Sequence, residues 1–180
     1  NRDSAMALSV RAMTRGKIMI GAVLLLGCCE ADWRASLQRA VSIHQGGDLA
    51  GSAEHYAEAL RLNPELRRSW PVLTNYALSI QKSAPAEAVV NFREVLALEP
   101  GADAYFNLGN ALVDAGEPLE AEAALKACLS LNPSDAEAYY TLASARMQQR
   151  GGVEVTSTAV EAVRTAIALG PADGKAWVSL

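Results

Sequence analysis

The sequence is poor in the residues that most often carry catalysis. Its 180 residues include two histidines and three cysteines, and aromatic side chains make up only 6% of it. His44 and His55 are not accompanied by cysteines or carboxylates at the spacing of metal ligands or of a nucleophile and its base. We therefore expect no catalytic residue, no metal site and no cofactor in this chain.

The body of the chain also lacks a stripe of basic residues. The formal net charge is -4, and residues 1–30 hold four basic and two acidic residues, a net of +2. Residues 31–180 therefore carry -6. An acidic body without a basic stripe argues against nucleic acid as a partner. The hydrophobic share of 51% argues against disorder.

The apolar run near the N-terminus is too short to cross a bilayer alone. It covers the nine residues Ile18 to Leu26, whereas a spanning helix needs about 20. Arg15 and Lys17 precede it and small residues follow it, which is typical of a signal peptide. We therefore assign residues 1–31 to upstream residues and a signal segment, and expect a protein that is secreted, periplasmic or membrane-anchored outside the cytoplasm.

Three outcomes remain open for this signal segment. Leu25-Leu26-Gly27-Cys28 resembles the lipobox of bacterial lipoproteins, in which the cysteine is lipidated. Ordinary cleavage after Ala31 fits the small residues before that position. The segment can also stay in place as an uncleaved apolar anchor. Contact with a membrane is expected only through this N-terminal anchor.

Proline recurs along the rest of the chain at a regular interval. Pro64, Pro100, Pro133 and Pro171 lie 36, 33 and 38 residues apart, and each stands two residues after a leucine. Because the residue before a proline is pushed out of helical geometry, each of these prolines predicts the end of a helix.

The segments between these prolines predict paired helices. Around Gly116, apolar residues fall three to four apart on both sides, which indicates two amphipathic helices joined by a short turn. Pro85 and Pro118 occupy the same place in two successive segments. We expect each to begin the second helix of its pair, where the amide that proline lacks would have no intrahelical partner.

The repeated unit resembles the tetratricopeptide repeat, a helix-turn-helix of 34 residues with the pattern W-x2-L-G-x2-Y, then A-x3-F, then P. The clearest copy fills the pattern with Tyr105, Leu108, Gly109, Leu112, Ala121, Leu125, Cys128 and Pro133. The preceding copy has Trp70 and Leu73 in its first slots, and the following copy departs from the pattern at Arg146.

The resemblance implies an all-α fold, a right-handed α-solenoid of stacked helix-turn-helix repeats. The array is expected to cover residues 32–180, with units at 32–66, 67–101, 102–135, 136–173 and a truncated 174–180. Because the last unit has no second helix to cover it, we expect the chain to be either the front part of a longer protein or the product of an unfinished gene model.

Some positions carry predictions about packing. We expect Gly109 to let the paired helices approach closely, Trp70 to point into the core and Cys128 to be a small buried residue. A further set of carboxylates is expected to serve as helix-start charges favoured by the helix dipole, namely Glu117, Glu120 and Glu122.

In the resembling family, the first helix of each pair lines a concave groove. Carried over by register, the groove positions predict a peptide-binding site of eight residues: Asn75, Phe106, Asn107, Asn110, Tyr140, Thr141, Ser144 and Gln148. Side-chain amides donate to and accept from an extended backbone, so the expected partner is a segment of another protein.

Three functions compete at this point. The first is a scaffold outside the cytoplasm that binds another protein in its groove. The second is the N-terminal substrate-recognition arm of a larger enzyme, because Asn107-Leu-Gly-Asn110 and the Leu-Asn-Pro endings look like the repeats of protein O-linked N-acetylglucosamine transferases. The third, an envelope lipoprotein that helps to assemble a pilus or an outer-membrane machine, rests on Cys28.

Overall fold

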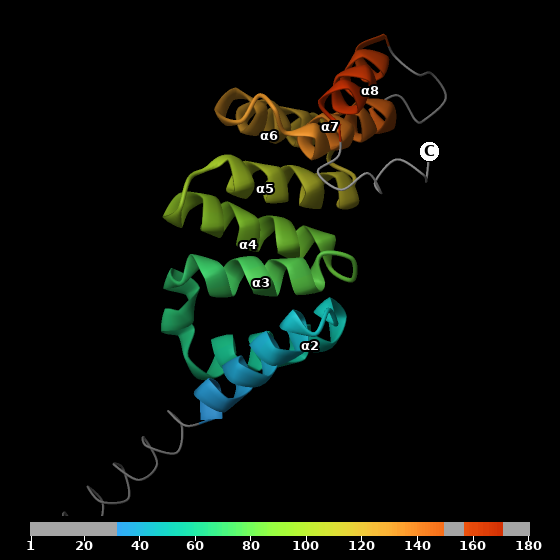
Figure 1. Cartoon of the computed structure of the whole chain (residues 1–180). Coiled ribbons are helices and arrows are strands. Elements are labelled where there is room, and N and C mark those ends of the chain that lie inside the picture. The colour runs from blue at the N-terminus through green and yellow to red at the C-terminus, as the bar shows by residue number, and fades with distance from the viewer. Residues whose placement is uncertain (1–31, 150–156, 171–180) are drawn as a thin grey trace, which may run out of the picture.

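The chain folds into helices throughout the part that the structure describes. The computed structural model describes residues 32–149 and 157–170, which contain eight α-helices and one 3-10 helix. The first described helix covers residues 32–45. The elements that follow are α2 (Leu49–Leu62), η1 (Pro64–Arg68), α3 (Trp70–Ile80), α4 (Pro85–Leu98), α5 (Ala102–Asp114), α6 (Pro118–Leu131), α7 (Ala136–Gln148) and α8 (Ser157–Leu169) (Figure 1).

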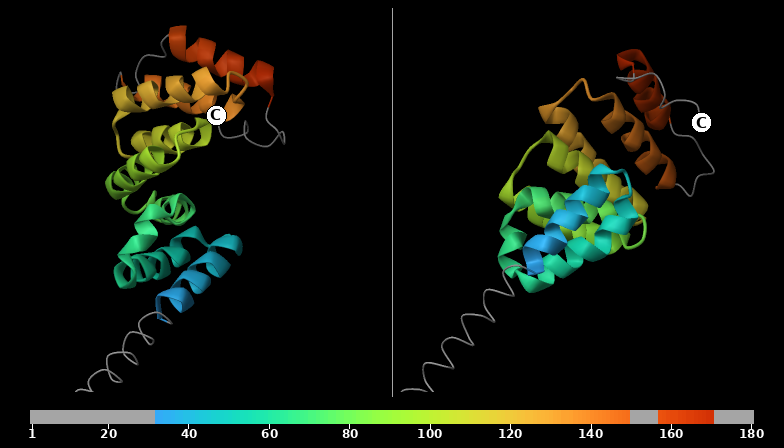
Figure 2. Two further views of the ribbon diagram at one scale, coloured as in Figure 1. Left: turned by 90° about the vertical axis from the view of Figure 1, so that its left-hand side faces the viewer. Right: turned by 60° about the horizontal axis from the view of Figure 1, so that its bottom comes forward.

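These helices form a stack of antiparallel pairs in chain order (Figures 1 and 2). The helix 32–45 lies beside α2, and α3 packs on α4, α5 on α6 and α7 on α8. Each second helix of a pair also packs on the first helix of the next pair, and α5 touches α7 directly. This arrangement confirms the all-α fold of stacked helix-turn-helix units.

The spaced prolines mark helix ends, as predicted. The helices α2, α4 and α6 end at Leu62, Leu98 and Leu131, each two residues before its proline. Pro85 and Pro118 are the first residues of α4 and α6, which confirms the prediction that each begins the second helix of its pair. Pro171 lies outside the described residues.

A continuous core runs through the stack. Leu73, Phe92, Leu112 and Leu125 are fully buried, one or two in each central pair of helices. Gly109 makes the close approach of α5 and α6 feasible, because a Cβ added there would lie 2.7 Å from Cγ of Leu125. The predicted role of this glycine is therefore confirmed.

The turn between α5 and α6 depends on one left-handed residue. Gly116 has φ +77°, a conformation that side-chain-bearing residues rarely adopt. Its amide donates to the carbonyl oxygen of Val113, and the Glu117 amide donates to that of Leu112. These bonds satisfy carbonyl groups at the end of α5, so α6 can reverse direction at once.

The prediction that Trp70 points into the core is wrong, because its side chain is 45% exposed. The reason is the helix η1, which repeat alignment did not predict. Its start is capped by the Asn63 side chain, which accepts a hydrogen bond from the Glu65 amide at 3.2 Å. Helix α3 consequently begins only at Trp70, and the ring lies at the helix end rather than between two helical turns.

Some predictions concern residues outside the described part of the chain. These are the signal segment 1–31 with Cys28 and the truncated unit 174–180. In the described part, no helix combines the length and apolar composition needed to cross a membrane.

Candidate functional site

The eight predicted groove residues lie on the first helices of three successive pairs. Asn75 belongs to α3, three of them belong to α5, and the other four belong to α7. Most are half-buried, as expected of a groove wall, and Gln148 is exposed. Thr141 is different because it is only 7% exposed and offers little surface to a ligand.

The residues of α5 form one stripe. Phe106 and Asn107 precede Asn110 by four and three positions, which places all three on one side of the helix. Tyr140 and Ser144 are spaced in the same way on α7, and α7 contacts α5 directly. The α5 and α7 members therefore lie on two helices that contact each other.

Asn75 lies apart from this stripe and faces the preceding pair. Burial raises the pKa of the Tyr56 hydroxyl on α2, and the Asn75 side chain beside it lowers that pKa by a smaller amount. Asn75 therefore serves at least partly as a polar neighbour of a buried tyrosine.

A cavity of about 410 Å³, here called the α3–α5 cavity, opens beside the stripe. Asn107 is the one predicted groove residue that lines it. The other lining residues come from α3, from the end of α4 and from the start of α5: Trp70, Thr74, Val95, Glu99, Gly101, Ala102, Asp103 and Ala104. Sequence reasoning missed this cavity, although the two carboxylates flanking Pro100-Gly101 were a visible signal.

Several polar groups of the α3–α5 cavity are left without partners. The Thr74 hydroxyl oxygen is buried and has no hydrogen bond. Within residues 32–149 and 157–170, the side chains of Asn107, Glu99 and Asp103 make no hydrogen bond or ion pair either. Of these groups only the Thr74 hydroxyl is buried, whereas Asn107 is half-buried and Glu99 and Asp103 are exposed to water. Because buried polar groups normally find partners, a ligand in the cavity can supply the one that Thr74 lacks.

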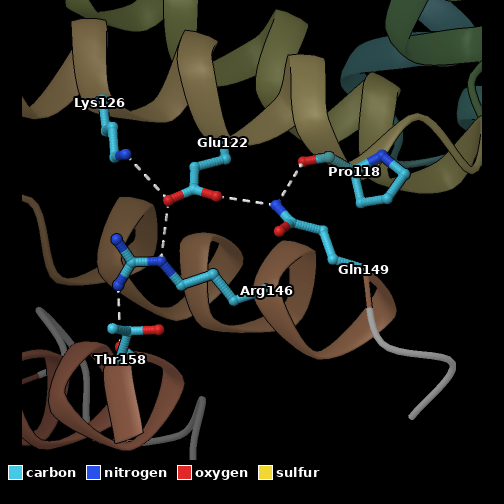
Figure 3. A network of polar contacts seen from close by, with 6 residues as sticks. All are labelled: Pro118, Glu122, Lys126, Arg146, Gln149 and Thr158. Atoms are coloured by element: carbon cyan, nitrogen blue, oxygen red, sulfur yellow. Dashed lines mark hydrogen bonds and ion pairs between the residues drawn. The ribbon is translucent and has the colours of Figure 1, made fainter. Parts of the chain in front are cut away.

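A second polar cluster joins α6, α7 and α8 (Figure 3). The Glu122 carboxylate accepts from Arg146 at 3.1 Å and from Gln149 at 2.7 Å, and Lys126 lies 3.0 Å from it. Arg146 also donates to the backbone oxygen of Thr158 at 2.8 Å. Arg146 therefore fills the position where the repeat pattern has an apolar residue, and links three helices.

This cluster corrects the interpretation of Glu122 as a helix-start charge. The hydrogen bond from Gln149 and the bonds from Lys126 and Arg146 lower the pKa of Glu122 to about 2, against a smaller opposing effect of burial. The charged form of Glu122 is therefore stabilised by contacts that join α6 to α7, and Arg146 extends the cluster to α8.

In the described part of the chain, Cys128 and His44 are packed against neighbouring side chains. Cys128 is fully buried, as predicted, and burial together with the carboxylates of Asp135 and Asp103 raises the pKa of its thiol to about 11. The His44 ring meets the Tyr56 ring edge-on, with centroids 6.0 Å apart. In the described part of the chain, no group of three or more His, Cys, Asp or Glu side chains is placed to hold a metal ion.

Comparison with known proteins gives a family match over part of the chain. Residues 102–145 match the family model described as tetratricopeptide repeat. A search of curated protein sequences finds no match.

Solved structures with the same fold include two MamA proteins and a transferase. A MamA protein is 23% identical, with 77% of this chain and 73% of MamA covered and a TM-score of 0.61. MamA from Desulfovibrio magneticus RS-1 is 21% identical, with 77% and 75% covered and a TM-score of 0.62. A mutant O-GlcNAc transferase from Thermobaculum terrenum is 26% identical, with 65% of this chain but only 22% of the transferase covered, at a TM-score of 0.51.

The structural similarity to the MamA proteins establishes a common fold. At these low sequence identities, it does not assign their functions to this chain. The fold agrees with the repeat that the family model matches and with the helical pairs on either side of it. Together, these observations show one tetratricopeptide repeat at residues 102–145, within a stack of helical pairs that has the same fold as the MamA structures.

Proposed function

We propose that this protein is a scaffold that binds a segment of another protein along the face formed by α3, α5 and α7. The observation that carries the proposal is the α3–α5 cavity, which opens beside the stripe of groove residues and holds polar groups without partners. A concave site with a few unsatisfied polar groups is the usual form of a binding site.

The side chains of the stripe suit an extended peptide. The amides of Asn107 and Asn110 have no partner among the described residues, and each can donate to and accept from a peptide backbone. Phe106 adds a half-buried ring beside them. Backbone hydrogen bonds provide affinity with little demand on partner sequence, and pockets beside them provide selectivity.

The cellular setting of this scaffold follows from the signal segment alone. Residues 15–31 have the composition of a secretory signal, so the proposed location is outside the cytoplasm. The intact mass of the mature protein separates the routes, because diacylation of Cys28 adds a large apolar mass and cleavage after Ala31 adds none. An envelope lipoprotein that helps to assemble a larger machine requires the acylated form.

A second candidate function is the substrate-recognition arm of a larger enzyme. It is favoured by the likeness to the O-GlcNAc transferase from Thermobaculum terrenum, of which this chain covers 22%. The coding sequence beyond Leu180 tests it directly. A glycosyltransferase domain there would support the enzyme, and a stop codon or further repeats would support the scaffold.

The scaffold proposal is tested by affinity capture from an extract of the source cells. The variant Asn107→Ala with Asn110→Ala removes both amides from the stripe. Ser130→Ala, an exposed polar position on α6, is the matched control. Partner proteins should be recovered with the wild type and the control but not with the double variant, at equal helicity by circular dichroism. Equal recovery with all three proteins would place the binding site elsewhere.

A further inference from the structure

The charge lining the α3–α5 cavity is of one sign. Its charged lining residues are Glu99 and Asp103, and no lysine or arginine among residues 32–149 and 157–170 lines it. Elsewhere in the described part, carboxylates near the ends of α5 and α6 are paired, Asp114 with Lys82 and Glu120 with Arg93. The two carboxylates at the cavity have no such partner in residues 32–149 and 157–170.

The helix ends at the cavity do not cancel this charge. Helix α4 ends at Leu98 and α5 begins at Ala102, so the C-terminus of α4 and the N-terminus of α5 are close together. A helix C-terminus carries about -0.5 of a unit charge and an N-terminus about +0.5, so the two offset each other. The remaining charge at the cavity is that of two solvent-exposed carboxylates, Glu99 and Asp103, which favours a cationic ligand over an anionic one.

The neutral groups of the cavity also suit a cation. Trp70, which lines the cavity, is 45% exposed, and the face of a tryptophan ring attracts ammonium and guanidinium groups. The unpartnered Thr74 hydroxyl and the Asn107 side-chain oxygen are acceptors. A guanidinium has five N–H donors in a planar fork, and an ammonium has three.

The size of the cavity fits a single side chain. Its volume of about 410 Å³ lies near the lower end of the range for small-molecule pockets, about 300 to 1,000 Å³. Thr74 and Asn107, which line it, come from α3 and α5, two of the three helices that form the proposed peptide-binding face. A peptide lying along that face can therefore direct one long side chain into it.

We propose that the α3–α5 cavity binds the cationic side chain of an arginine or lysine in the partner segment. Glu99 and Asp103 supply the opposite charge, Trp70 stacks on the cationic group, and the Thr74 and Asn107 oxygens accept its remaining hydrogen bonds. This inference rests on the proposed function, because it names the partner chemistry at one point of the same face.

A random dodecapeptide library displayed on phage is the probe. It is selected on three immobilised full-length proteins: the wild type, the variant Glu99→Gln with Asp103→Asn, and the control Glu54→Gln with Glu117→Gln. The control makes the same change in net charge at two exposed positions outside the cavity. Sequences selected by the wild type and the control should be enriched in arginine or lysine, and those selected by the cavity variant should not.

The most enriched peptide is then synthesised with its basic residue intact and with norleucine in its place. The norleucine peptide should bind the wild type about tenfold more weakly, from two partly exposed charge interactions. The cavity variant should lose about the same factor for the basic peptide and should not distinguish the two peptides.

The outcomes separate this inference from the proposed function. Two results would overturn the cationic pocket and leave peptide binding intact. One is selection of peptides that contain no basic residue. The other is an equal loss of affinity, for the wild type and for the cavity variant, when the basic residue is replaced by norleucine. Enrichment of acidic peptides would overturn it as well. No enrichment of any peptide on the folded wild type would count against the proposed function itself, and the inference would fall with it.

Discussion

Replacing Gly109 with alanine tests how the helical pair α5 and α6 is packed. An alanine Cβ would lie 2.7 Å from Cγ and 2.9 Å from Cδ2 of Leu125. Leu125 is fully buried, so it cannot swing into solvent to make room. Ordinary contact between carbon atoms needs about 3.5 to 4.0 Å, so the two helices must separate or Leu125 must leave its rotamer.

The expected change in stability is the sum of two opposing effects. Overpacking of a core costs about 1 to 3 kcal/mol. Alanine in a helix interior gains about 1 kcal/mol over glycine through helix propensity. Gly109→Ala should therefore lower the free energy of unfolding by about 1 kcal/mol, taking the middle of the overpacking range. Without the contact to Leu125, the same substitution would raise it by about 1 kcal/mol.

A double-mutant cycle with Leu125→Ala isolates that contact. Leu125→Ala alone should cost about 2 to 5 kcal/mol because it leaves a cavity. In its background, Gly109→Ala should become stabilising, which gives a coupling of about 2 kcal/mol. The assay is urea unfolding followed by far-ultraviolet circular dichroism for all four proteins. Additive effects, or a stabilising Gly109→Ala in the wild type, would refute the assigned packing.

Two further predictions concern groups with shifted pKa values. Glu122→Gln should lower the free energy of unfolding at pH 7 by about 1 to 3 kcal/mol, because it weakens charge-assisted hydrogen bonds. Since the folded pKa of Glu122 is lowered from 4.5 to about 2, its contribution is present above pH 4.5 and is lost as the pH falls to about 2. Urea unfolding should therefore show the wild type and the variant converging over that range, and a constant difference would contradict the cluster. Cys128 is buried, and the pKa of its thiol is about 11, so iodoacetamide should not alkylate it in the native protein at pH 8 but should do so in urea. Peptide mass mapping measures the alkylation, and rapid reaction of the native protein would contradict the burial of Cys128.

The parts of the fold that were predictable depend on local chemistry. Pro133 is an example, because a proline acts on the residues next to it and fixes where a helix ends. The close helix approach at Gly109 was predictable for a related reason, because its place in the repeat pattern fixes which face of α5 meets the next helix. Neither prediction required knowledge of distant residues.

The parts that were not predictable depend on competing or distant contacts. Trp70 was assigned to the core by repeat register, but the side chain of Asn63 starts a 3-10 helix that delays the start of α3. Glu122 stands near a helix start in the sequence, whereas its partner Arg146 comes from the next helical pair. The repeat pattern includes neither the local cap at Asn63 nor the contact between Glu122 and Arg146 of successive repeats.

The candidate site was predicted only in part, for the same physical reason. Asn107 and Asn110 follow from the register of one helix. The α3–α5 cavity needs Trp70 and Thr74 from one pair and Asp103 from the next, and it exists only because of the way the pairs stack. Thr141 was assigned to the groove by register, yet the packing of α7 buries it.

The most direct measurement is amide chemical-shift mapping by nuclear magnetic resonance on the full chain, titrated with the selected basic peptide. Binding along α3 and α5 should shift the amides of Thr74 and Asn107 and the indole N–H of Trp70 most strongly. Val90 on α4 and Ser130 on α6, both exposed on second helices, should stay unchanged. The largest shifts at Val90 and Ser130, with Thr74 and Asn107 unmoved, would contradict binding at the proposed face.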